Sequence, residues 1–142
     1  MTVAQLRAEL PEDVTYVFPL PHVPRAASFV RRRVRAILAD WHLPADVAED
    51  VLLLASELLT NAITHALPPA TLRLSQVLVD GLRAVHIEVT DAGPAAPADR
   101  PACELDPDEH GRGIEIVVAL SARYGMQELA GGTSRWADVV VR

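Results

Sequence analysis

The dipeptide Asp80-Gly81 constrains the fold of this chain more than any other feature of its sequence. It lies between two runs, 71–79 and 82–90, and in the second run every other residue from position 85 to 89 is apolar. Such alternation is typical of a strand with one buried face, and an Asp-Gly pair between two strands favours a tight turn. The sequence therefore predicts an antiparallel hairpin in the middle of the chain.

Two helices are predicted ahead of this hairpin. Apolar residues recur at helical spacing over 24–41, with arginines between them, and again over 44–66. Pro68 and Pro69 end the second helix, because proline cannot continue a helical hydrogen-bond ladder. A short strand over 14–18 comes first, and the prolines that follow it keep it from being a central strand.

The chain after the hairpin predicts a long loop, a third helix and a second hairpin. The segment 94–110 has no periodicity and contains four prolines, and a loop of that length is usually functional or disordered. A shorter helix is predicted over 114–121, followed by strands over 123–129 and 136–141. This order predicts an α+β fold, a two-layer sandwich with about three helices packed on one face of a mostly antiparallel sheet.

Composition excludes several classes of function. At 142 residues the chain is predicted to be a single domain, with residues 1–13 as a mobile leader. A net charge of −6 argues against direct nucleic-acid binding, and the basic cluster at 31–35 is either a solvated helix face or a partner contact. The lone Cys103 excludes an internal disulfide. Because no apolar run is long enough to cross a membrane, we expect a cytoplasmic protein with no membrane contact.

Three polar residues interrupt the apolar face of the second helix. Glu57, Asn61 and His65 stand at i, i+4 and i+8, so their side chains form one column. The carboxylate could take a proton from an attacking hydroxyl, the amide oxygen could ligate Mg²⁺, and the imidazole could meet a phosphate. The alternative is a solvated polar stripe, which most amphipathic helices have.

A glycine-rich segment stands at the start of the third predicted helix. In Gly111-Arg112-Gly113, backbone N–H groups, the positive end of the helix dipole and a guanidinium come together, which would suit a phosphate. The alternative is an ordinary glycine-rich helix entry with a solvated arginine.

Two further polar positions occur beside glycines. Asp91 ends a buried strand next to Gly93, and its carboxylate could accept a hydrogen bond from an exocyclic amine such as that of adenine; an aspartate here could equally be a turn former. The segment 131–133, Gly-Gly-Thr, is either a tight turn or a turn that directs the Thr133 hydroxyl at a ligand.

Together these stretches resemble the four ATP-site motifs of the gyrase, heat-shock-90, histidine-kinase and mismatch-repair ATPase superfamily. The motifs are E-L-L-T-N-A-I-T-H-A at 57–66, D-A-G at 91–93, H-G-R-G-I at 110–114, and G-G-T at 131–133 followed by Trp136. Within the superfamily the chain is most similar to the small stand-alone anti-sigma factor serine kinases of bacteria. The resemblance covers nearly the whole chain and implies a histidine-kinase-like ATPase domain.

The resemblance implies a role for each motif at the base end of ATP and at the site of chemistry. Asn61 would ligate a Mg²⁺ ion that bridges the phosphates, and Glu57 would be the general base. Asp91 would bind the adenine amine, Gly93 would shape that pocket, and Thr133 would support the adenine end.

The remaining motif residues would meet the phosphates. The predicted phosphate contacts come from four residues at the third helix, Gly111, Arg112, Gly113 and Ile114. His65 would make a further contact, since the superfamily often has a basic residue at that position. The segment 94–110 would be the ATP lid. One departure is Ala95, which occupies the position of a second glycine in the superfamily motif.

Two functions follow from the resemblance. The first is an ATP-dependent serine/threonine kinase that phosphorylates an anti-sigma antagonist protein, binds a sigma factor when the antagonist is absent, and forms a homodimer. The second is a nucleotide-regulated binding module that sequesters a regulatory partner without phosphorylating it.

Overall fold

The computed structural model describes residues 15–21, 23, 25–93 and 115–141. Helices and strands follow one another in a simple order, and residues 115–120 are helical as well. The named elements are β1 (Tyr16–Leu20), α2 (Ala26–Asp40), α3 (Ala45–His65), β2 (Ala70–Val79), β3 (Leu82–Asp91), β4 (Arg123–Leu129) and β5 (Gly132–Val140).

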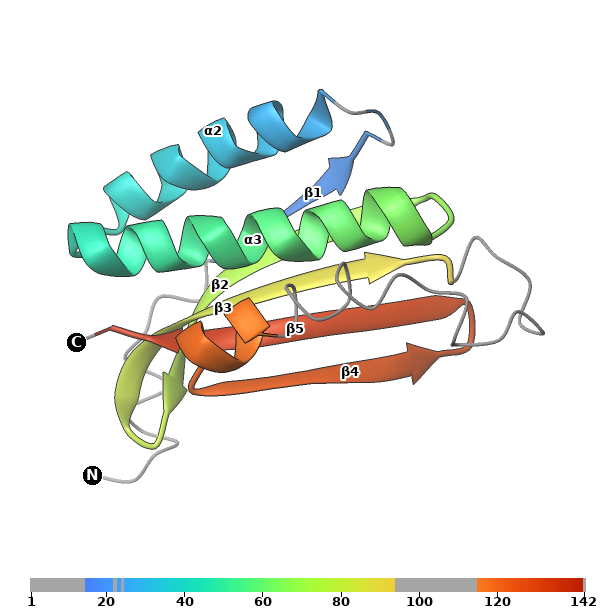
Figure 1. The fold of residues 1–142 in the computed structure, drawn as a ribbon. Helices are drawn as coiled ribbons and strands as arrows, with labels where there is room; N and C mark the ends of the chain where they lie inside the picture. Colours follow the sequence, from blue (N-terminus) through green and yellow to red (C-terminus); the bar gives the residue numbers. More distant parts are fainter. Residues whose placement is uncertain (1–14, 22, 24, 94–114, 142) are drawn as a thin grey trace.

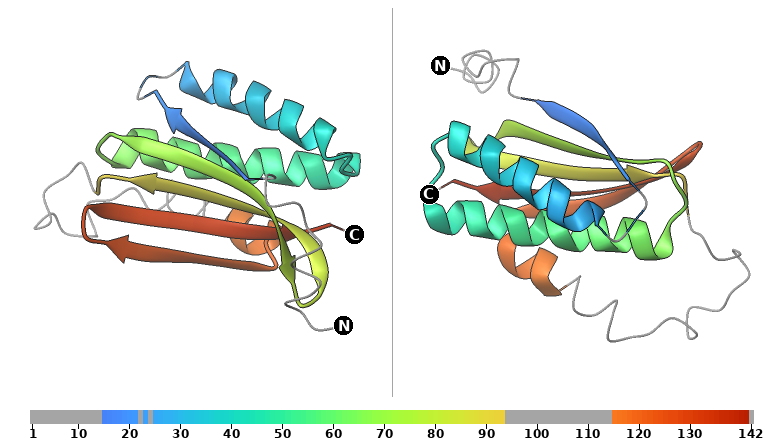
Figure 2. Two further views of the ribbon diagram at one scale, coloured as in Figure 1. Left: turned by 180° about the vertical axis from the view of Figure 1, so that it is seen from behind. Right: turned by 90° about the horizontal axis from the view of Figure 1, so that it is seen from above.

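The strands form one five-stranded sheet in the order β1-β2-β3-β5-β4, and every neighbouring pair is antiparallel. In Figure 1, α3 crosses the sheet between α2 and the helix at 115–120. The right-hand view of Figure 2 shows all three helices on the same side of the sheet. The predicted α+β sandwich with three helices on one face is confirmed, and the other face of the sheet carries no helix among the described residues.

The first strand differs in position from the prediction. It covers 16–20 rather than 14–18, so it includes Pro19, which lies opposite Thr71 in β2. This position is compatible with proline because β1 is an edge strand, where one side of the backbone needs no ladder partner. The prolines correctly predicted that this strand is not central.

The central hairpin is confirmed by its turn geometry. Asp80 and Gly81 connect β2 to β3 with φ angles of 52° and 79°. Positive φ at both central residues is the geometry that matches the right-handed twist of paired strands. The β2–β3 ladder then runs without interruption from the turn to Thr71, opposite Thr90.

The core lies between the helices and the sheet. On β3, Val85, Ile87 and Val89 are almost completely buried, as the alternation predicted. They pack in one cluster with the apolar face of α3, which includes Leu54 and Leu59. No helix among the described residues is long and apolar enough to cross a membrane.

Candidate functional site

The end of α3 is fixed to the end of β3 by backbone hydrogen bonds. The Leu67 N–H donates to the Gly93 carbonyl at 2.8 Å, and the Ala92 N–H donates to the Leu67 carbonyl at 3.0 Å. The last turn of the helix therefore lies beside the Asp-Ala-Gly segment. Two stretches that are 25 residues apart in the sequence thus meet at one end of the sheet, and both were predicted to belong to the same site.

Thr133 joins the same place through the β3–β5 ladder. It stands directly opposite Asp91, and directly opposed residues lie on the same face of a sheet. That face is the one beneath the helices, because Ile87 and Ala137, another opposed pair of the same ladder, are both completely buried in the core. The structure therefore brings Asp91, Gly93 and Thr133 together, as the sequence predicted.

The Asp91 carboxylate is held at both oxygens. Its side chain is only 1% exposed. Oδ1 accepts the Gly93 N–H at 2.8 Å, and Oδ2 accepts an N–H from Nη1 of Arg135 at 3.2 Å. Gly93 has a φ of 105°, a conformation that other residues rarely adopt, so glycine is required for this backbone bond. The carboxylate is consequently fixed in position before any ligand arrives.

Arg135 is absent from the predicted site, although a signal for it exists. It follows Thr133 by two positions on β5, so the strand period of two places both side chains on the helix-covered face. Recognising this needs the extent of β5, which the sequence led us to begin at residue 136. The structure begins the strand at Gly132.

The predicted turn at 131–133 is therefore wrong in its position by one to two residues. The turn lies at 130–131, and Gly132 and Thr133 already pair with β4. Gly132 passes so close to β3 that an added Cβ would overlap the carbonyl oxygen of Asp91. The second glycine of this motif thus permits close strand approach, whereas a Cβ on Gly131 would meet open space.

The predicted polar column lies along α3, which packs against β3 and β5. Glu57, Asn61 and His65 are all partly exposed, beside buried Leu58 and Ala62. At the helical rise, Glu57 lies roughly 12 Å along the axis from His65, which is the member nearest the Asp91 end. The column therefore runs along α3 away from the Asp91 end.

Several predicted site residues lie outside the described part of the chain. These are Gly111, Arg112, Gly113 and Ile114, together with the segment 94–110 and the leader 1–13. The helical residues that follow are described, and Ile116, Val117 and Leu120 pack against the core.

The described residues would supply few ligands to a metal ion. No group of three or more His, Cys, Asp or Glu side chains in this part of the chain could hold one. The Asn61 side chain is a hard oxygen donor of the kind Mg²⁺ takes, and Mg²⁺ usually keeps waters and substrate phosphates as its other ligands. A Mg²⁺ ion that arrives with a nucleotide fits this donor set.

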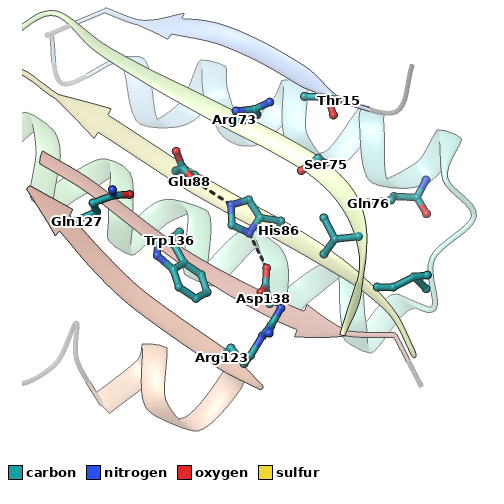
Figure 3. A pocket seen from close by; sticks show the side chains of 12 residues that line it. Thr15, Arg73, Ser75, Gln76, His86, Glu88, Arg123, Gln127, Trp136 and Asp138 are labelled. Atoms are coloured by element: carbon teal, nitrogen blue, oxygen red, sulfur yellow. Dashed lines mark hydrogen bonds and ion pairs between the residues drawn. The ribbon is translucent and has the colours of Figure 1, made fainter. Parts of the chain in front are cut away.

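A second polar cluster lies on the helix-free face of the sheet, in a groove of about 540 Å³ (Figure 3). His86 is at its centre: Nδ1 lies 2.6 Å from Asp138 Oδ1, and Nε2 lies 3.0 Å from Glu88 Oε1. Arg123 reaches the other oxygen of Asp138 at 3.4 Å. Trp136 stacks on the imidazole with ring centroids 5.6 Å apart. The cluster residues on β3 and β5 alternate with the core positions of those strands, so the cluster faces away from Asp91.

The cluster raises the pKa of His86. Burial of the ring favours its neutral form and would lower the pKa, but the hydrogen bonds to Asp138 and Glu88 and the negative charges of both raise it above the ordinary value of 6.5. Only the imidazolium can donate from both ring nitrogens at once. In the sequence, His86 and Glu88 alternate with the apolar residues of their strand, but the pairing of His86 with Asp138 depends on the register of β5.

We expect Gly132→Ala to destabilise the protein. The added methyl must push β5 away from the Asp91 backbone, and overpacking of this kind costs about 1–3 kcal/mol or more of unfolding free energy. Gly131→Ala is the matched control and should change stability by less than about 0.5 kcal/mol. Chemical denaturation of both variants measures the difference; equal midpoints would mean that the strands do not approach as closely as described.

We also expect the stability of the protein to depend on pH through His86. A pKa that is higher in the folded than in the unfolded state adds stability that is fully present below about pH 6.5 and is lost as the pH rises through the folded value. The thermal midpoint of the wild type should therefore fall relative to that of His86→Gln as the pH is raised above about 6.5. Parallel curves for the two proteins over this range would contradict the assignment.

Comparison with known proteins places the chain in a family. Residues 20–136 match the model of the histidine kinase-like ATPase domain. The crystal structure of the RsbU and RsbW domains of Rv1364c from Mycobacterium tuberculosis is similar, with a TM-score of 0.67 and 21% identity over 90% of this chain and 33% of that one. The blue-light activated histidine kinase EL346 of Erythrobacter litoralis is similar with a TM-score of 0.53 and 20% identity over 87% of this chain and 42% of that one.

At these identities the likeness is one of fold, and the chain spans about a third of the first structure and about two fifths of the second. No curated protein matches the chain. The family model, by contrast, extends from the end of β1 into β5 and includes all four motif segments, 57–66, 91–93, 110–114 and 131–133. The chain belongs to the histidine kinase-like ATPase domain family.

Proposed function

We propose that this protein is an ATP-dependent serine/threonine kinase of the anti-sigma factor type. It transfers the γ-phosphate of ATP to a serine or threonine of an anti-sigma antagonist protein and binds a sigma factor. The observation that carries the proposal is the junction of α3 with β3, where the Asp91 carboxylate lies at the end of the helix that presents Glu57 and Asn61. Membership of the histidine kinase-like ATPase family and the resemblance of the motifs support it.

The base end of ATP belongs at Asp91. The carboxylate accepts a hydrogen bond from the exocyclic amine of adenine, and its fixed position lowers the ordering cost of binding. Gly93 leaves room beside it because it has no side chain. Thr133, on the opposite strand and the same face, supports the adenine ring from the side of β5.

The phosphates belong along α3 and at the start of the third helix. Asn61 would hold a Mg²⁺ ion, which would supply charge neutralisation during transfer. The other phosphate contacts come from His65, Gly111, Arg112, Gly113 and Ile114, with 94–110 as the lid. Backbone N–H groups at a helix start suit phosphate oxygens without any special chemistry.

Glu57 is the proposed general base. The acceptor hydroxyl loses its proton to the Glu57 carboxylate as its oxygen bonds to the γ-phosphorus, and the bond from that phosphorus to the bridging oxygen breaks to release ADP. Phosphoryl transfer depends mainly on positioning and electrostatic stabilisation, so one base, one metal ligand and a set of phosphate contacts are sufficient.

We expect Asn61→Ala to abolish the dependence of ATP binding on Mg²⁺. In the wild type, ATP with Mg²⁺ at about a hundred times its Kd should add about 2.7 kcal/mol of stability, seen as a higher thermal midpoint. The variant should keep the fold, and ATP should raise its thermal midpoint by the same small amount with Mg²⁺ as with a chelator. Thr60→Ala, a change at an exposed position of the same helix, is the control and should behave as wild type. Unchanged binding by Asn61→Ala would mean that the column is a solvated stripe.

We expect Glu57→Gln to separate catalysis from binding. The amide keeps the shape of the side chain but cannot take the proton, and loss of a general base lowers the rate by about 10²- to 10⁴-fold. Nucleotide affinity should stay close to that of the wild type. The measurement pairs an ATP titration with a phosphotransfer time course on an antagonist that the wild type phosphorylates, and Glu49→Gln, an exposed carboxylate of α3, is the control.

Two results would contradict this role. Equal phosphotransfer by Glu57→Gln and wild type would remove Glu57 from the mechanism. Absence of transfer by the wild type with several antagonists, despite ATP binding, would favour the nucleotide-regulated binding module instead of the kinase.

A further inference from the structure

The carboxylate assigned to the nucleotide base already has a cationic neighbour. Arg135 reaches diagonally across the β3–β5 ladder to Asp91, with 3.2 Å between Nη1 and Oδ2. The Asp91 side chain is 1% exposed, whereas the Arg135 side chain is 36% exposed. The arginine thus forms the accessible side of a buried ion pair.

This ion pair leaves hydrogen-bonding groups on both partners. A guanidinium has five N–H donors, and only one of those on Arg135 is directed at Asp91. A carboxylate oxygen has two acceptor positions, so Oδ2 can accept a second hydrogen bond beside the one from Arg135. An acceptor and several donors are therefore next to each other where the base would arrive.

The two groups have opposite preferences at C6 of a purine. Adenine carries an amine there, which donates, and hypoxanthine and guanine carry a carbonyl, which accepts. An ionised carboxylate can only accept, so a carboxylate alone favours the amine and disfavours the carbonyl. A guanidinium can only donate, so its presence shifts the balance towards the carbonyl. The direction of this shift does not depend on the detailed pose of the base.

We propose that Arg135 is a specificity-determining residue that broadens base selection, so that the site binds purine nucleoside triphosphates with a carbonyl at C6 as well as ATP. The proposal rests on the proposed nucleotide site at Asp91. It assigns to Arg135 a contact with the base in addition to its ion pair with Asp91.

Inosine triphosphate is the most direct probe, because its base differs from adenine only at C6 and in the proton on N1. The experiment measures the Kd of ATP and of inosine triphosphate, each with Mg²⁺, for the wild type, Arg135→Leu and Arg135→Lys. For the wild type we expect the two Kd values to agree within about tenfold. Arg135→Leu should raise the preference for ATP by about tenfold or more, since the carbonyl then faces a carboxylate with no donor beside it. Arg135→Lys keeps the charge and should stay close to the wild-type ratio.

Arg123→Leu is the matched control. Arg123 also forms an ion pair with a buried aspartate, Asp138, but on the helix-free face of the sheet. Its loss should leave the ratio of the two Kd values unchanged. If Arg135 had a purely structural role, Arg135→Leu would change the stability of the protein, as Arg123→Leu does, but would leave the ratio of the two Kd values unchanged.

The outcomes separate this proposal from the one on which it rests. A wild type that binds neither nucleotide contradicts the proposed function. A wild type that binds ATP but prefers it to inosine triphosphate by more than about tenfold overturns the role of Arg135, and so does an unchanged ratio in Arg135→Leu. The two Kd values of the wild type test the proposal even if Arg135→Leu fails to fold. Arg135→Gln then provides the uncharged variant, and we expect it to prefer ATP over inosine triphosphate more strongly than the wild type does.

Discussion

The two backbone hydrogen bonds between Leu67 and the Ala92–Gly93 segment determine where everything else in the site can lie. They join the end of α3 to the end of a central strand, and each element brings its own polar groups to the junction. The helix supplies the column that includes Asn61, and the strand supplies Asp91. Because backbone groups make the connection, the junction tolerates changes of side chain at Leu67 and Ala92 but depends on the helix ending where it does.

The sequence was sufficient for the fold and for the proximity of some residues of the candidate site. Alternation and the Asp80-Gly81 turn predicted the central hairpin, and helical spacing predicted α2 and α3 within one or two residues of their observed ends. These are local signals, because each depends only on residues close together in the chain. Asp91, Gly93 and Thr133 were also brought together as expected, through the β3–β5 ladder.

The missed residues have one physical cause in common. Arg135 and Asp138 both lie on β5, and their partners Asp91 and His86 lie on β3. Which residues of two strands stand opposite each other depends on the pairing register, and the sequence placed the start of β5 four residues too late. A strand's alternation predicts which residues share a face, but the partner of each residue follows only from the register.

One sheet therefore separates two charge pairs that share the same two strands, and the register of β5 against β3 controls both. A slip of β5 by a single residue against β3 would move every side chain of the strand to the opposite face. The Arg135 guanidinium would then leave Asp91 for the helix-free side, and the Asp138 carboxylate would enter the apolar core without His86. The buried Ala137 and Val139 of β5 oppose such a slip, because it would move both out of the core.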